Sequence, residues 1–118
     1  MIYLDYNATT PIDPRVKEAV LPYLGKYFGN PSTSYFHGQK AKMAVGQARE
    51  QVATIICASP EEIVFTSGGS ESDNHAIIDT ALANMANGKH IITSCIEHPA
   101  VLNTCRYLEE INPGLLTI

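Results

Sequence analysis

The 118-residue sequence contains no tryptophan, only three cysteines and few aromatic residues. Twelve acidic residues against eight basic ones give a formal net charge of −4. The basic residues are scattered between Arg15 and Arg106 rather than gathered in a patch, which argues against a nucleic-acid partner. Three cysteines without tight spacing argue against a secreted disulfide scaffold.

Long hydrophobic runs are also missing. No stretch approaches the roughly eighteen apolar residues of a membrane span, and the N-terminal sequence MIYLDYNATTP has neither the basic start nor the apolar segment of a secretory signal. We therefore expect a cytoplasmic or organelle-interior protein, with no membrane span and no membrane partner. A hydrophobic fraction of 45% excludes a disordered chain, and the length supports one modest core but not two full domains.

Helices are expected in the first half of the chain. Asp13-Pro14 predicts a helix start, with a capping side chain followed by proline at the first helical position, and Pro22 should kink this helix or end it early. The turn-rich stretch 29–34 predicts a loop. After the loop, apolar residues recur every three or four positions, which predicts a second helix. These residues are Ala41, Ala44, Val45, Ala48, Val52 and Ile55.

In the second half of the chain, sequence patterns typical of strands alternate with patterns typical of helices. The predicted elements are a strand at 63–66, a helix from Ser70 to a stop at Asn87-Gly88, a strand at 90–94, a helix from His98-Pro99 to about Asn112, and a strand at 115–118. Strands that alternate with helices through short connections form βαβ units with parallel strands. The sequence therefore predicts the α/β class, with a mostly parallel sheet and flanking helices.

Two details of these helices follow from the pattern. The sequence from Ser70 to Asp73 has the form of a capping box, which predicts Ser70 as the N-cap. In the last helix, Thr104, Cys105 and Leu108 share one face with Val101, and we expect this face to be buried.

The turn Ser67-Gly68-Gly69-Ser70 is the first candidate site. It leads from a predicted strand into a helix N-terminus, where glycines let the backbone approach a ligand and unpaired N–H groups point outward. Such a turn suits a phosphate, and the Ser70 hydroxyl could add a hydrogen bond. Alternatively, the glycines are there only because the backbone of the turn requires them. The nearby Glu71 carboxylate would repel an anion unless it points away from the site.

Glu97-His98-Pro99 is the second candidate site, at the end of the next predicted strand. An imidazole at this position could stack on a planar ligand or move protons near neutral pH; the alternative is a capping or surface histidine. Cys95 and His98 have a spacing that metal ligands use, but a closed zinc site needs about four ligands and no second pair is visible. We therefore predict no metal site. Cys57 and Cys105 are expected in the core, which leaves Cys95 as the cysteine that could react.

Four motifs cover nearly the whole chain. They are LDYNATTP at 4–11, FGNPS at 28–32, FTSGGSESDN at 65–74 and EHPAV at 97–101. In this order and spacing they resemble the amino-terminal part of the cysteine desulfurases, the NifS/IscS-like enzymes of aminotransferase class V that use pyridoxal 5′-phosphate (PLP).

The resemblance implies the fold type I architecture of PLP enzymes. That architecture has a large domain built around a mostly parallel sheet, a smaller domain, and a homodimer with active sites at the interface. Residues 1–118 would then form the amino-terminal arm, the helices and the first βαβ units of the PLP-binding large domain, with no complete second domain.

The resemblance also assigns roles to three residues. Gly69 and Ser70 would hold the cofactor phosphate, although the family more often has threonine at the position of Ser70. His98 would stack on the pyridine ring and assist proton transfer, which makes it both a cofactor-binding and a catalytic residue.

The family converts L-cysteine to alanine and takes its sulfur as a persulfide for iron–sulfur clusters, passing it to an acceptor protein. Selenocysteine lyases of the same group remove selenium. Neither the lysine that forms the Schiff base nor the loop cysteine that attacks the sulfur has a matching position in this sequence. We therefore expect the chain to be inactive by itself and PLP not to be attached covalently.

Three hypotheses follow. The chain is the cofactor-phosphate-binding part of a full cysteine desulfurase, which is the favoured interpretation because the sequence stops at a predicted strand. Alternatively, it is a naturally short, non-catalytic relative that binds PLP or another phosphate compound. The third hypothesis is a module that self-associates through apolar surface and an uncovered strand edge.

Overall fold

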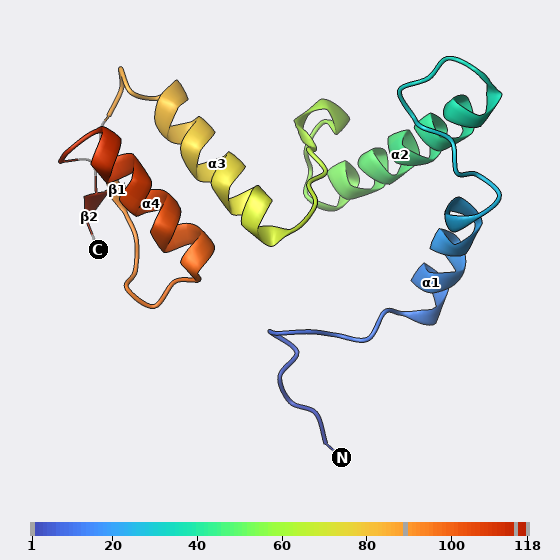
Figure 1. Ribbon diagram of the computed structural model, residues 1–118, viewed down its shortest axis with the longest axis horizontal. Helices are drawn as coiled ribbons and strands as arrows, with labels where there is room; N and C mark the ends of the chain where they lie inside the picture. Colours follow the sequence, from blue (N-terminus) through green and yellow to red (C-terminus); the bar gives the residue numbers. More distant parts are fainter. Residues whose placement is uncertain (1, 89, 115, 118) are drawn as a thin grey trace. The chain divides into compact units, whose positions relative to one another are not determined.

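Helices make up most of the structure. The computed structural model describes residues 2–88, 90–114 and 116–117, and Figure 1 follows the chain through them. In chain order the elements are α1 (Pro14–Val20), η1 (Leu21–Leu24), α2 (Phe36–Ile55), η2 (Pro60–Glu62), α3 (Gly69–Ala83), β1 (Ile91–Ile92), α4 (Pro99–Ile111) and β2 (Leu116–Thr117). The chain divides into two compact units, Met1–Ile63 and Val64–Ile118.

Helix α1 begins where the sequence predicts. The Asp13 carboxylate caps it by accepting a hydrogen bond from the backbone N–H of Arg15 at 2.8 Å. The Arg15 guanidinium also donates to this carboxylate at 2.7 Å, and these bonds hold the pKa of Asp13 below its usual value. The α-helix ends at Val20 and continues as the 3-10 helix η1, which contains Pro22. The predicted early end is therefore confirmed.

Helix α2 starts at Phe36, five residues before Ala41, and its buried residues are Gly38, Ala41 and Ala53. Gly38 is required because the preceding loop lies directly against it. A Cβ atom at this position would overlap the Thr33 hydroxyl and would lie 2.6 Å from the Asn30 carbonyl oxygen. The predicted loop at 29–34 is confirmed, and it packs on the first turns of α2.

Helix α2 ends in a Schellman motif. The backbone N–H of Ala58 donates to the Ala53 carbonyl at 2.9 Å, and that of Cys57 donates to the Thr54 carbonyl at 3.4 Å. Cys57 therefore adopts the left-handed conformation, with φ of 55°. The expectation of a buried Cys57 is wrong: its thiol is exposed, because the motif turns the chain away from the helix at this residue.

The predicted strand at 63–66 is not part of a sheet. These residues carry no regular secondary structure, and the Ile63 carbonyl accepts a hydrogen bond from Arg49 Nε at 3.1 Å. A strand needs a neighbouring strand to satisfy its backbone groups. Within the described ranges only β1 and β2 pair with each other, so the expectation of a second βαβ unit is wrong.

One βαβ unit is present. Strand β1 pairs in parallel with β2, in the register Ile91↔Leu116 and Ile92↔Thr117, and α4 connects the two strands. The strand predicted at 90–94 is shortened to two residues. Of the strand predicted at 115–118, the middle two residues pair, whereas 115 and 118 lie outside the described residues. Where a larger parallel sheet was expected, the described part of the chain holds a two-stranded one.

Helices α3 and α4 pack against each other. Figure 1 shows them side by side, with their N-termini at the same end. The α4 residues Thr104, Cys105 and Leu108 are buried, as predicted, and burial raises the pKa of the Cys105 thiol. Helix α3 ends at Ala83, before the stop predicted at Asn87-Gly88. The packing brings the two predicted site segments to one end of the helix pair.

Candidate functional site

The first turn of α3 is built around two glycines. Gly68 is the N-cap and has an extended backbone, and Gly69 is the first helical residue. Apart from the adjacent residues and the backbone of α3 itself, no atom lies within 4 Å of where a Cβ atom would stand at either glycine, so the backbone is open to approach. The first N–H groups of any α-helix have no partner within the helix. The turn therefore offers donors that a ligand can reach.

The predicted capping box at Ser70 is wrong. The N-cap lies two residues earlier, at Gly68, which caps the helix without a side-chain hydrogen bond. The third helical residue, Glu71, instead reaches back to Ser67, whose backbone N–H and hydroxyl donate to the carboxylate at 2.6 and 2.5 Å. Ser70 therefore does not cap the helix, and no capping bond occupies its hydroxyl.

The Glu71 carboxylate is hydrogen-bonded to Ser67, in the turn before α3. Hydrogen bonds from the Ser67 hydroxyl, and then from its backbone N–H, hold the pKa of Glu71 below its usual value. The carboxylate therefore carries its charge near the N-terminus of α3, where the helix dipole favours an anion.

His98 begins α4. It is the N-cap of the helix, and its Nδ1 accepts a hydrogen bond from the backbone N–H of Ala100 at 3.1 Å. A nitrogen that accepts carries no hydrogen, so this geometry assigns the proton of the neutral ring to Nε2. The side chain is exposed. Capping thus fixes the orientation of the imidazole and leaves Nε2–H as a donor for a ligand.

Ser70 and His98 line the same cavity, at the N-terminal ends of α3 and α4. Its volume is about 380 Å³, within the usual range of roughly 300–1,000 Å³ for ligand sites. Its polar lining residues are Ser70, Asn74, His98, Asn103, Thr104 and Tyr107. None of the described residues that line this cavity carries a carboxylate, so its polar groups suit an anionic ligand.

Gly69 is not among the lining residues, although it lies next to Ser70. Asn74 and Thr104 were not predicted as site residues; they connect the two helices through a hydrogen bond of 2.6 Å between Thr104 Oγ1 and Asn74 Oδ1. They are 30 residues apart, and no local signal indicates their contact.

A second cavity lies elsewhere in the same unit. Its volume is about 410 Å³, and its lining includes Ile77, Ala81 and Ile91. The lining surface is mainly apolar, and the cavity shares no residue with the first. Although it is slightly larger, it contains none of the predicted site residues.

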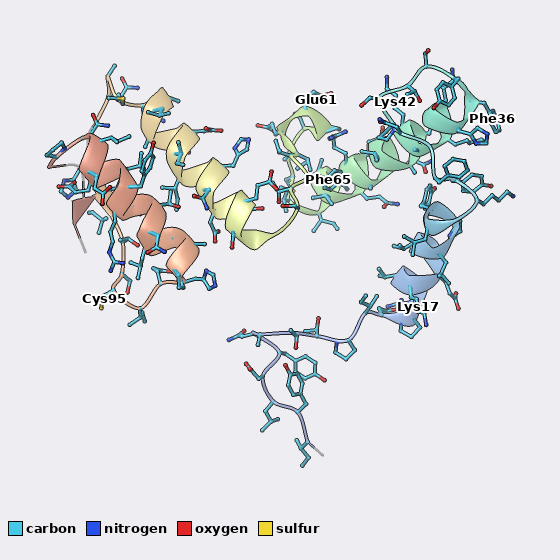
Figure 2. The ribbon with its side chains drawn as sticks, in the orientation of Figure 1. Lys17, Phe36, Lys42, Glu61, Phe65 and Cys95 are labelled. Atoms are coloured by element: carbon cyan, nitrogen blue, oxygen red, sulfur yellow. The ribbon has the colours of Figure 1, made fainter. Side chains whose placement is uncertain are left out.

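The cysteines and histidines do not form a metal centre in the part of the chain that the structure describes. No group of three or more metal-ligating side chains is found there. Cys95 is exposed, and Figure 2 shows it on the loop between β1 and α4. In the same described ranges, no helix has both the length and the apolar character needed to cross a membrane.

Comparison with known proteins identifies the protein family to which the chain belongs. The family model described as aminotransferase class V matches residues 2–113. The cysteine desulfurase IscS of Photorhabdus laumondii is 57% identical, covering 92% of this chain and 28% of the relative. The IscS of Methanosarcina thermophila is 54% identical, covering 92% of this chain and 27% of the relative.

Solved structures agree with this result. One described as SspA in complex with cysteine has a TM-score of 0.85 at 45% identity, covering 98% of this chain and 33% of that one. A NifS-like protein has a TM-score of 0.86 at 37% identity, covering 98% of this chain and 32% of that one. The chain therefore spans about a third of these structures, and 27–28% of the two curated relatives.

Proposed function

Because the chain belongs to the aminotransferase class V family, we propose that it is the cofactor-phosphate-binding part of a PLP-dependent cysteine desulfurase. The reaction is the conversion of L-cysteine to alanine, with its sulfur passed on as a persulfide; a selenocysteine lyase would remove selenium from selenocysteine instead. The observation that carries the proposal is that Ser70 and His98 line one cavity without a lining carboxylate.

The described residues fit the phosphate of PLP. The backbone at Gly69 is open, because a Cβ there would meet no atom within 4 Å. The Ser70 hydroxyl is not used for capping. Glu71, the acidic residue closest in sequence, is bound back to Ser67 and is not a lining residue. Gly69 and Ser70 therefore hold the phosphate through N–H and hydroxyl donors.

His98 fits the ring of the same cofactor. Its imidazole is held by the Nδ1 hydrogen bond at the start of α4, so its face would be able to stack on a planar ring and its Nε2 would be able to hold or move a proton. The bound cofactor itself supplies the electron sink for chemistry at the substrate α-carbon. His98 would thus be both a catalytic residue and, with Gly69 and Ser70, a cofactor-binding residue of this segment.

The rest of the machinery is assigned to other parts of a full enzyme. The motifs of the lysine that holds the cofactor and of the cysteine that takes up sulfur have no matching positions in this sequence. We place the segment in the fold type I large domain of a cytoplasmic homodimer that delivers sulfur to an acceptor protein. The chain alone is expected to bind PLP reversibly and to show no desulfurase activity.

Titration of the chain with PLP, followed by fluorescence, tests the proposal. We expect saturable binding that is weakened by inorganic phosphate and strongly reduced in Gly69→Val, because a branched side chain crowds the approach to the backbone. Gly69→Ala is the matched control, because its Cβ alone has room. Equal affinity in the wild type and in Gly69→Val would reject the phosphate site.

A variant pair separates ring stacking from capping. Asparagine caps helices well but has no ring, whereas alanine has no ring and is also a poor cap. We expect His98→Asn to keep the stability of α4 and lose PLP affinity, and His98→Ala to lose both, with a stability cost of about 1 kcal/mol. Thermal unfolding and PLP titration measure the two effects. Wild-type affinity in His98→Asn would show that the ring does not touch the cofactor.

A naturally short, non-catalytic relative remains the second candidate, because the phosphate site needs only residues of this segment. The mass of the native polypeptide distinguishes the two: the first candidate requires a product of the relatives' size, and the second requires one of 118 residues. For either, borohydride should trap no PLP on a specific lysine of the isolated chain.

A further inference from the structure

A series of hydrogen bonds connects the Ser70 carbonyl to the His98 imidazole through the side chains of Asn74 and Thr104 and the backbone of Ala100. Asn74 Nδ2 donates to the Ser70 carbonyl at 2.6 Å. Thr104 Oγ1 lies 2.6 Å from Asn74 Oδ1 and 2.7 Å from the Ala100 carbonyl oxygen. The backbone N–H of Ala100 donates to His98 Nδ1 at 3.1 Å. All five residues also line the candidate cavity.

The chemistry of these groups fixes the direction of each bond. A carbonyl only accepts, so the amide nitrogen of Asn74 must face Ser70; the opposite orientation would place two oxygens 2.6 Å apart. Asn74 Oδ1 then faces Thr104, whose hydroxyl must be the donor. The single hydroxyl hydrogen is shared between Asn74 and the Ala100 carbonyl, so the Thr104 hydroxyl joins the first turns of α3 and α4.

The series lies partly inside the helix interface. Thr104 is only 4% exposed, and Asn74 is half-buried. Removing the Thr104 hydroxyl would leave Asn74 Oδ1 without its donor in a place that water reaches poorly, and the Asn74 side chain would have to turn. Because the same side chain holds the Ser70 carbonyl, a change at Thr104 is transmitted to the first turn of α3.

We propose that Asn74 and Thr104 are positioning residues of the cofactor site, which set Ser70 and His98 relative to each other. The inference rests on the proposed function for its ligand, but the connection between the two residues exists in the free chain. Asn74 and Thr104 act on the cofactor through Ser70 and His98.

Three variants of the full chain test this. Thr104→Val keeps the shape of the side chain and removes the hydroxyl, whereas Thr104→Ser keeps the hydroxyl and serves as the rescue. Leu108→Val is the matched control: it removes one methylene group from another buried position of α4 and touches no polar group. A purely structural role for Thr104 would make the valine variants at 104 and 108 behave alike.

The first readout needs no ligand. We expect Thr104→Val to shift the nuclear magnetic resonance signals of both the Ser70 amide and the His98 imidazole, whereas Thr104→Ser and Leu108→Val leave both close to the wild type. Wild-type signals at Ser70 and His98 in Thr104→Val, or equal shifts in Leu108→Val, would overturn the inference.

The second readout is PLP affinity. We expect Thr104→Val to bind PLP about threefold to tenfold more weakly, the usual effect of losing one hydrogen bond, and Thr104→Ser to stay within about twofold of the wild type. Unchanged affinity in Thr104→Val would overturn the positioning role. If the wild type itself does not bind PLP, the proposed function fails, and the ligand-free spectra alone decide whether Thr104 couples the two residues.

Discussion

At the scale of single residues, the structure gives several side chains roles that composition does not indicate. Cys57 is the clearest case. It terminates α2 in a left-handed conformation that glycine usually supplies, because a Cβ atom crowds the following carbonyl there. Its thiol is exposed, so the residue contributes backbone strain without core packing.

Replacing Cys57 with glycine should therefore stabilise the chain. We expect a gain of about 0.5–1 kcal/mol, since relief of the left-handed strain outweighs the greater freedom of glycine in the unfolded chain. Cys57→Ala is the control, because it removes the thiol and keeps the strain, so its stability should match the wild type. Chemical denaturation measures both variants. A glycine variant that is less stable than the alanine one would contradict the assigned conformation.

Glu71 predicts a pH dependence. Its pKa is lowered in the folded chain, so the Ser67–Glu71 bonds stabilise the charged form. This stabilisation is fully present above the ordinary pKa of 4.5 and is lost as the pH falls through the lower, folded value. Between about pH 5 and pH 3, the wild type should lose stability more steeply than Glu71→Gln, whose side chain does not titrate. Parallel acid unfolding curves would contradict this.

At the scale of elements, local signals predicted the helices but only part of the sheet, because β1 and β2 pair in parallel as expected whereas 63–66 forms no strand. The Asp13-Pro14 and His98-Pro99 starts are correct because capping and proline chemistry act within a few residues. The buried face of α4 is correct because helical spacing alone defines it. The segment 63–66 has the composition of a strand, but pairing depends on a distant partner that local pattern does not encode.

The candidate site, like the fold, was predicted where local signals suffice and not where it depends on packing between helices. Ser70 and His98 were found from turn chemistry and the family motifs, and the structure places both on one cavity. The bridge between Asn74 and Thr104 could not be predicted, because it depends on how α3 packs against α4. The first turn of α3 was misplaced because Glu71 binds the preceding Ser67, whereas the Ser70–Asp73 pattern suggested a later start.

Replacing either of two glycines in α2 with alanine should change the stability of the chain in opposite directions. Gly46→Ala has free space around its Cβ and should stabilise the helix by about 0.5–1 kcal/mol. Gly38→Ala meets the loop at Thr33 and Asn30 and should destabilise by about 1–3 kcal/mol through overpacking. Thermal unfolding compares the two. Similar shifts in both variants would mean that the loop does not pack on the start of α2.

At the scale of the whole molecule, few apolar side chains are buried. In the described part of the chain, the buried hydrophobic residues are Ala41, Ala53, Cys105 and Leu108. Large apolar side chains in both units are exposed, such as Ile55 at 82% and Ile96 at 89%. Exposed apolar surface on this scale favours association.

We therefore expect the isolated chain to self-associate, as the third hypothesis states. Its mean mass in sedimentation equilibrium should rise with protein concentration, and it should bind a hydrophobic dye. The control is the same chain in a low concentration of urea, where association through apolar surface should weaken. A mass of one chain at every concentration would count against this expectation.

The most direct test of the proposed PLP site maps the residues that respond to the ligand. Amide and imidazole resonances would be followed while PLP, inorganic phosphate and phosphate-free pyridoxal are added separately. We expect PLP and phosphate to shift the signals of Gly69 and Ser70, and PLP and pyridoxal to shift those of His98. Shifts confined to the second cavity, around Ile77 and Ile91, or no saturable shift at all, would contradict it.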